Sequence, residues 1–138
     1  MTVLSFDQYH VLQMFYQRNE NFKSTLNKIS LTPKIKQKVA IKGNQVKVTL
    51  TAEVGTLDKK NVPFKAGCSV SGIFTYRAAE DNANVGIDAL IRNNAVAILY
   101  PYIRSIIAFL TTSSNEFPGY NLPTINVSQI LAQDENIN

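Results

Sequence analysis

"LTPKIKQKVAIKGNQVKVTLTAEVG", residues 31–55, contains the pattern that decides the fold. On both sides of the Gly43-Asn44 pair, apolar and polar residues alternate with a period of two, which is typical of strands with one buried face. The apolar positions are Ile35, Val39, Ile41, Val46, Val48, Leu50, Ala52 and Val54. Two such runs around a Gly-Asn turn predict a β-hairpin with one apolar face and one solvated, basic face.

Two further segments predict strands that join this hairpin. "YHVLQMFY", residues 9–16, is rich in β-branched and aromatic residues. "FKAGCSVSGIFTYR", residues 64–77, places one apolar set on a single side: Phe64, Ala66, Cys68, Val70, Gly72, Phe74 and Tyr76. Gly72 inside this run suggests a bulge or the close approach of another backbone. The sequence therefore predicts a sheet of four antiparallel strands.

A helical pattern follows "EDNAN", residues 80–84, and extends from Ile87 to Pro101. Proline can begin a helix but strains one that continues through it, so we expect a break or kink near Tyr100. Beyond it, a stripe broad enough to cover a sheet is formed by Tyr102, Ile103, Ile106, Ile107 and Leu110. "VSQILAQ", residues 127–133, predicts a short C-terminal helix capped by Asn126. Because the strands precede the long helices, we expect an α+β fold in one domain, residues 1–138.

The composition limits the cellular setting and the partners. Fourteen Lys and Arg residues against ten Asp and Glu give a net charge of +4, and the lysines concentrate between Lys34 and Lys65. This bias makes nucleic acid or an acidic protein surface a candidate partner. The single cysteine, Cys68, forms no internal disulfide, no secretory signal pattern opens the sequence, and the longest strictly apolar run is residues 95–103. We therefore expect a cytoplasmic protein without a membrane span.

The sequence offers little for catalysis. The one histidine, His10, falls in a predicted strand, and Cys68 fits a small core position. Carboxylates are scattered over predicted loops at Asp58, Glu80, Asp81 and Asp88. No metal-ligand spacing, phosphate-binding glycine loop or nucleophile motif is present, so we expect no enzyme activity, metal or cofactor. A nucleic-acid-binding module is the rival of another class, but the aromatic residues lie away from the lysine run.

The region after the helical stripe resembles a known family. "LYPYIRSIIAFLTTSSNEFPGYNLPTIN", residues 99–126, and the sequence after it resemble the helix, loop and terminal helix of the export chaperone SecB. Leu99, Tyr100, Pro101, Tyr102 and Arg104 match the first block of the family pattern, and Phe117, Pro118, Asn121, Leu122, Asn126 and Leu131 match the second. "SGIFTYR" and "MFYQRNENF" are similar to strands of the same family. The resemblance extends from about residue 10 to the end.

The resemblance implies a fold and a function. SecB-like proteins have a four-stranded antiparallel sheet with a long helix across one face, and they form tetramers built as dimers of dimers. They hold unfolded polypeptides in apolar grooves without ATP. The crossover after the first strand and the loop after the long helix border these grooves. By this resemblance, the expected client-binding residues are Phe22, Leu26, Phe117, Tyr120, Leu122 and Ile125, and the expected subunit-interface residues are Tyr102, Ile106, Ile107 and Leu110.

The sequence leaves open whether the apolar loop is exposed, and it differs from typical SecB proteins on the outer face of the sheet. An apolar loop between two helices can instead pack against its own sheet. Typical SecB proteins are acidic and dock the ATPase SecA through carboxylates on the outer sheet face, whereas the comparable positions here are Gly67 or Ser69. The resemblance therefore implies either a chaperone dedicated to the antitoxin of a toxin–antitoxin–chaperone system or a general preprotein export chaperone. Delivery to SecA is doubtful.

Overall fold

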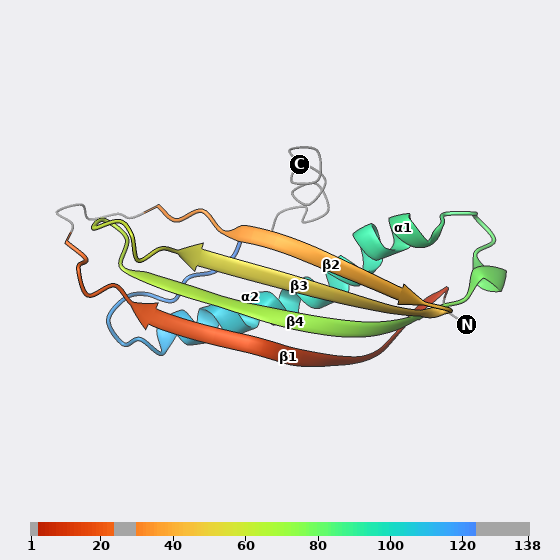
Figure 1. Cartoon of the computed structure of the whole chain (residues 1–138), viewed down its shortest axis with the longest axis horizontal. Coiled ribbons are helices and arrows are strands. Elements are labelled where there is room, and N and C mark those ends of the chain that lie inside the picture. Colours follow the sequence, from red (N-terminus) through yellow and green to blue (C-terminus); the bar gives the residue numbers. More distant parts are fainter. Residues whose placement is uncertain (1–2, 24–29, 124–138) are drawn as a thin grey trace.

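The fold is a four-stranded antiparallel sheet with one long helix across one face (Figure 1). The computed structural model describes residues 3–23 and 30–123. The strands are β1 (Leu4–Arg18), β2 (Lys34–Lys42), β3 (Gln45–Gly55) and β4 (Phe64–Tyr76), and they lie in the order β1-β4-β3-β2. The predicted α+β class and sheet are confirmed, while the predicted C-terminal helix at residues 127–133 lies outside the described residues.

The hairpin has the predicted register. β2 pairs with β3 from Lys34 opposite Glu53 to Lys42 opposite Gln45. Gly43 has a φ of +60°, a conformation that costs glycine little and most other residues more, so the tight turn falls at the predicted pair. The apolar side chains of β3 are fully buried, whereas Val39 and Ile41 at the far end of β2 are exposed.

The strand β1 is longer than the predicted run and less regular. It pairs along its whole length with β4, with register shifts between Phe6 and Gln8 and between Val11 and Gln13. Each shift inserts one extra residue and changes which side chains face the helix. The bulges are therefore in β1 and not at Gly72, and the atoms that approach Gly72 most closely belong to side chains instead of the predicted second backbone. A Cβ added there would lie 2.8 Å from a methyl carbon of Leu99.

The helical layer begins after a turn organised by Asp81. Its carboxylate accepts hydrogen bonds from the backbone N–H groups of Gly86 and Val85, which hold the pKa of Asp81 below its usual range. The helical elements are η1 (Ala78–Glu80), α1 (Ile87–Leu90), the π-helical turn η2 (Ile91–Ala95) and α2 (Val96–Thr112).

The predicted break near Tyr100 is wrong, because α2 continues through Tyr100 and Pro101. The irregular turn lies one turn earlier, at η2. Proline removes the hydrogen bond to the carbonyl four residues before it, here Ala97. Both Pro101 and Ala97 are exposed, so the ring points to solvent and does not disturb the packing of the helix on the sheet.

The core lies between α2 and the two central strands. Leu99, Ile103 and Ile107 of α2 are fully buried against the apolar faces of β3 and β4, and Phe74 is the largest side chain completely enclosed. The helix contacts β1 much less, so the helix-facing side of β1 is only partly covered. The opposite face of the sheet, called here the outer face, has no helix over it among residues 3–23 and 30–123 (Figure 1).

The continuous helical run Ile87–Thr112 has 26 residues and is long and apolar enough to cross a membrane by length and composition alone. Core helices of proteins that never enter a membrane meet the same criterion. Here the run packs along the sheet through its buried residues, which accounts for its apolar character.

Candidate functional site

Four aromatic side chains meet at the end of the sheet where β1 ends and β4 begins. This aromatic cluster consists of Tyr16, Phe22, Phe64 and Phe117, which come from β1, the segment after it, β4 and the loop after α2. Phe117 lies edge-on to Phe22 at 5.6 Å between ring centroids and 6.0 Å from Phe64. Phe22 and Phe117 are both half-buried. Two predicted client-binding residues, 95 positions apart, are thus brought together, and Tyr16 and Phe64 join them.

An exposed ion pair joins the two chain segments that carry these rings. The guanidinium of Arg18 donates two hydrogen bonds to the carboxylate of Glu116, Nε to Oε1 at 2.7 Å and NH2 to Oε2 at 2.9 Å. It also contacts Glu20 at 2.9 Å. The hydrogen bond from Arg18 holds the pKa of Glu116 below its usual range. Because the side chains are 50% and 38% exposed, solvent screens the charges, and we regard the pair mainly as a positioning contact.

The loop after α2 is fixed to the helix by hydrogen bonds. The backbone N–H of Tyr120 donates to Thr111 Oγ1 at 2.7 Å, and this hydroxyl donates to the carbonyl of Ile107 at 2.8 Å. The hydroxyl of Tyr100 donates to the Pro123 carbonyl at 2.6 Å. These bonds give the loop a defined path over the sheet, as expected where backbone polar groups would otherwise be buried without partners.

Tyr120, a predicted client-binding residue, makes contacts through both its backbone and its side chain. Its ring is half-buried against the core, and its hydroxyl donates to the carbonyl of Leu31, just before β2. Burial raises the pKa of the Tyr120 phenol, so it remains a protonated donor at neutral pH. Tyr120 therefore connects the loop after α2 to the chain that enters the hairpin.

Leu122 requires a correction. It is 1% exposed and belongs to the core cluster, and its carbonyl accepts a hydrogen bond from Arg104 Nε at 3.1 Å. In this structure it fills the protomer's own interior and cannot line an open groove. The alternative that the loop packs on its own sheet thus holds fully for Leu122 and in part for Phe117 and Tyr120, which pack against the core but remain half-exposed. Leu26 and Ile125 lie outside the described residues.

The predicted interface residues include one buried residue and three partly exposed ones. Ile107 lies on the sheet-facing side of α2 and is completely buried, so its assignment to a subunit interface is corrected to the core. Tyr102, Ile106 and Leu110 are partly exposed. Tyr102 stacks on Tyr9 of β1 at 4.3 Å between ring centroids, which places it at the margin between helix and strand.

Large apolar side chains that the sequence analysis did not assign are exposed on β1 and α2, the two elements that meet at this margin. We group these residues as the β1–α2 surface: Tyr9, Val11, Leu12, Met14 and Phe109. Phe109 is 69% exposed and Met14 is 56% exposed. The signal in the sequence was the aromatic and β-branched run at residues 9–16. The register shift between Val11 and Gln13 interrupts the alternation of this run, so the period of two did not reveal which side chains share a face.

The described residues show neither a reactive thiol nor a cluster of metal ligands. Cys68 is buried, and burial raises the pKa of its thiol to about 11, so it is not a reactive thiolate. Within residues 3–23 and 30–123, no group of three or more His, Cys, Asp or Glu side chains could hold a metal ion. The features that stand out are apolar surfaces and a rigid scaffold, which suit binding.

Comparison with known proteins places this geometry in a family. The family model described as "Preprotein translocase subunit SecB" matches residues 3–137. The chain belongs to the SecB family. The comparison with curated proteins gives no significant match. Because the family model covers nearly the whole chain, the SecB-like resemblance of the loop after α2 is confirmed at the level of the family.

Two solved structures share the fold. The SecB-like chaperone Rv1957 of Mycobacterium tuberculosis, solved in complex with a ChAD peptide from the HigA1 antitoxin, has a TM-score of 0.69 and 15% identity, covering 88% of this chain and 90% of that chain. A protein of unknown function from Streptococcus agalactiae has a TM-score of 0.50 and 14% identity, covering 87% and 96%. At these identities the likeness to this SecB family chain is one of fold.

Proposed function

We propose that this SecB family protein is an ATP-independent holdase chaperone that binds unfolded or aggregation-prone polypeptides. The observation that carries the proposal is the aromatic cluster, in which the half-exposed Phe22 and Phe117 meet at the end of the sheet. A chaperone for many sequences needs broad apolar contact and few exact hydrogen bonds. Aromatic rings provide large apolar surfaces with few rotatable bonds, so they suit such a site.

The strength of this contact favours an assembly with several sites. Burying one client side chain contributes about 1.5–3 kcal/mol, whereas association costs roughly 4–15 kcal/mol. A single small cluster therefore binds weakly. Several clusters on one oligomer that engage a single long client can raise avidity by ~10²–10⁴. Oligomerisation is thus part of the proposed mechanism.

The β1–α2 surface is our candidate for the subunit contact. It is linked to Tyr102, one of the expected interface residues, by the stacking of Tyr9 on Tyr102. Ile106 and Leu110, the other expected interface residues that are not fully buried, lie on the same helix. Large apolar patches exposed to solvent are typical of protein–protein contact sites. We propose a homotetramer built as a dimer of dimers, in which this surface buries its apolar side chains against a second copy.

The client that we propose is the antitoxin of a toxin–antitoxin–chaperone system, and the alternative is general preprotein export through SecA. The M. tuberculosis relative in complex with an antitoxin peptide supports the first. The second would need the carboxylates that typical SecB proteins carry on the outer face. Here Gly67 and Ser69 stand at the comparable positions, and Gly67 is covered by the ring of Phe15. The proposed location is the cytoplasm, without a cofactor.

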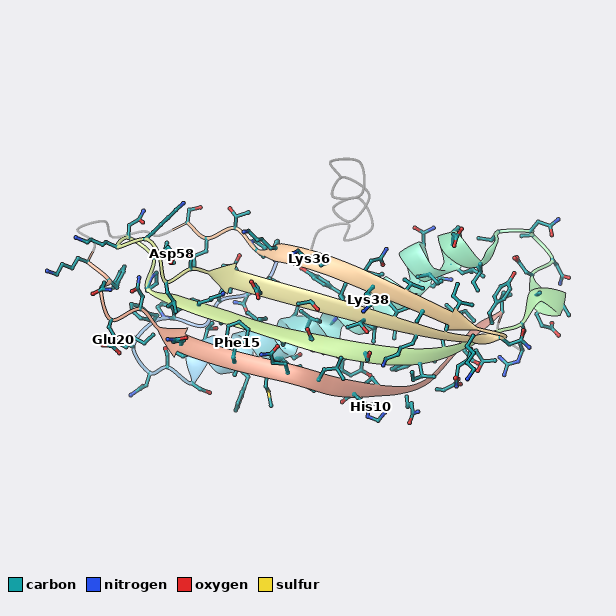
Figure 2. The ribbon with its side chains drawn as sticks, viewed as in Figure 1. His10, Phe15, Glu20, Lys36, Lys38 and Asp58 are labelled. Carbon is teal, nitrogen blue, oxygen red and sulfur yellow. The ribbon has the colours of Figure 1, made fainter. Side chains whose placement is uncertain are left out.

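Suppression of client aggregation tests the binding site. Replacing Phe22 and Phe117 by Ala should abolish protection of a thermally unfolding client, while Phe15→Ala serves as the matched control because its ring lies on the outer face (Figure 2). Oligomeric mass and circular dichroism would be measured for each variant. Full protection by a correctly folded double variant would remove the basis for the assignment.

Oligomeric mass tests the assembly separately. Leu12→Glu with Phe109→Glu places charges on the β1–α2 surface and should convert the tetramer into smaller species, seen by light scattering. Gln17→Glu, on an exposed outer-face position of the same strand, is the control and should keep the native mass. A double variant that remains tetrameric would exclude this surface as the contact.

A further inference from the structure

The outer face of the sheet carries an excess of positive charge. The strand register places six lysines on this face: Lys34, Lys36, Lys38 and Lys42 from β2, Lys47 from β3 and Lys65 from β4. Their neighbours along each strand point to the opposite face, where those of Lys47 and Lys65 are buried in the core. Figure 2 labels Lys36 and Lys38 on β2, across the sheet from His10 and Phe15 on β1.

Few acidic groups balance this charge. Glu53 lies opposite Lys34, and Asp7 accepts a hydrogen bond from Thr75 Oγ1 at 2.6 Å at the other side of the sheet. The ion pairs of Arg18 with Glu20 and Glu116 involve none of the six lysines. The charge is therefore available to a partner.

Three of the lysines lie close together, and we call them the lysine patch: Lys36, Lys38 and Lys47. Lys36 and Lys38 are two positions apart on the same face of β2, about 7 Å along the strand. Lys38 pairs with Thr49, two residues from Lys47, so Lys38 and Lys47 are diagonal neighbours. Such neighbours lie about 7–8 Å apart, a spacing that carboxylates on one polypeptide can match.

Next to the patch, the central strands present small hydroxyl side chains. Thr49 and Ser71 share a hydrogen bond at 2.8 Å, and Thr51 and Ser69 share one at 2.7 Å. In each pair one hydroxyl donates to the other. Ser71 is buried, so the hydroxyls that can donate a second proton to a bound segment are those of Thr49, Thr51 and Ser69, which are partly exposed. The small side chains leave the backbone of a bound segment room to approach. Hydroxyls and ammonium groups together are the donors that bind carboxylates.

Protection of a sheet edge accounts for only part of this pattern. Lysines on an edge strand discourage edge-to-edge association, and β2 is an edge strand. Lys47 lies on β3 and Lys65 on β4, each of which has a neighbour on both sides, so edge protection does not explain them.

We propose that the outer face of β2, β3 and β4 is a docking surface for an acidic segment of a partner protein. Its carboxylates contact the lysine patch, and its remaining oxygens accept hydrogen bonds from the partly exposed hydroxyls of Thr49, Thr51 and Ser69. Nucleic acid fits less well, because stacking of bases needs aromatic platforms. Phe15 is the one aromatic side chain on the outer face of the four strands, and it covers Gly67 instead of standing beside the patch.

Binding of a fluorescent peptide of about eight glutamates tests the proposal by anisotropy at two salt concentrations. The variant Lys36→Gln, Lys38→Gln, Lys47→Gln should weaken binding by more than ~10-fold at low salt, since it removes three attractive contacts between unit charges at a solvated surface. The matched control replaces three exposed loop lysines, Lys23, Lys59 and Lys60, by Gln and should retain binding within about twofold. Both variants should still suppress client aggregation, because the aromatic cluster is untouched.

Three outcomes would overturn the proposal. The first is the absence of saturable peptide binding by the native protein. The second is an equal loss in both triple variants, which would show that net charge alone attracts the peptide. The third is tighter binding of a single-stranded oligonucleotide with the same dependence on the lysine patch, which would assign the surface to nucleic acid.

Discussion

Replacement of Leu122 by Ala tests whether the loop after α2 is part of the folded core. Leu122 is 1% exposed and packs with the residues buried between α2 and the sheet. The change removes three carbon atoms, worth about 2.4 kcal/mol at ~0.8 kcal/mol each. The cavity that remains brings the expected loss to about 2–5 kcal/mol in the free energy of unfolding. This is a large part of the total stability of an ordinary domain.

The loss can be read as a shift in melting temperature. With about 2.1 cal/mol/K of unfolding entropy for each of 138 residues, the total is near 0.3 kcal/mol/K, so Tm should fall by roughly 7–17 °C. Scanning calorimetry at fixed protein concentration measures it, with the exposed neighbour Asn121→Ala as control. A Leu122→Ala protein that melts within about 2 °C of the native protein would show that the loop is not packed in solution, and the correction made for Leu122 would fail.

Three other predictions follow from particular contacts. Gly72→Ala should cost about 1–3 kcal/mol and lower the urea midpoint, because the added Cβ lies 2.8 Å from a methyl of Leu99; a neutral result would contradict the close approach. Glu116 has a pKa lowered by the hydrogen bond from Arg18, so its contribution to stability is present above the unfolded pKa of about 4.3 and lost as pH falls through the lower folded value. Glu116→Gln should therefore make the melting temperature fall less below about pH 4, whereas a profile identical to that of the native protein would show that the pair does not form. Cys68 has a pKa raised to about 11 by burial, so a thiol reagent at neutral pH should label it far more slowly before unfolding than after; equal rates would exclude a buried thiol.

The sequence alone determined the sheet and its apolar face. Apolar and polar residues alternate at residues 31–55 and 64–76 with the period of a strand. This pattern can be read locally, because successive side chains of a strand point to opposite faces of the sheet. Gly43 specifies its turn through its own backbone freedom. The residues around Pro101 and Phe117 indicated the SecB family, because a family pattern consists of residue types at fixed spacings and these are visible in the sequence.

Tertiary structure alone decided which of the apolar residues are exposed. Leu122 and Phe117 belong to the same loop, yet one is enclosed by α2 and the sheet while the other meets Phe22 at the surface. The bulges in β1 redirect its side chains, and the limited cover from α2 leaves Met14 exposed. Pro101 was expected to break the helix, but it faces solvent, where a missing hydrogen bond is tolerated. Local pattern fixes the direction of a side chain relative to its own strand or helix, whereas burial depends on what distant parts of the chain place over it.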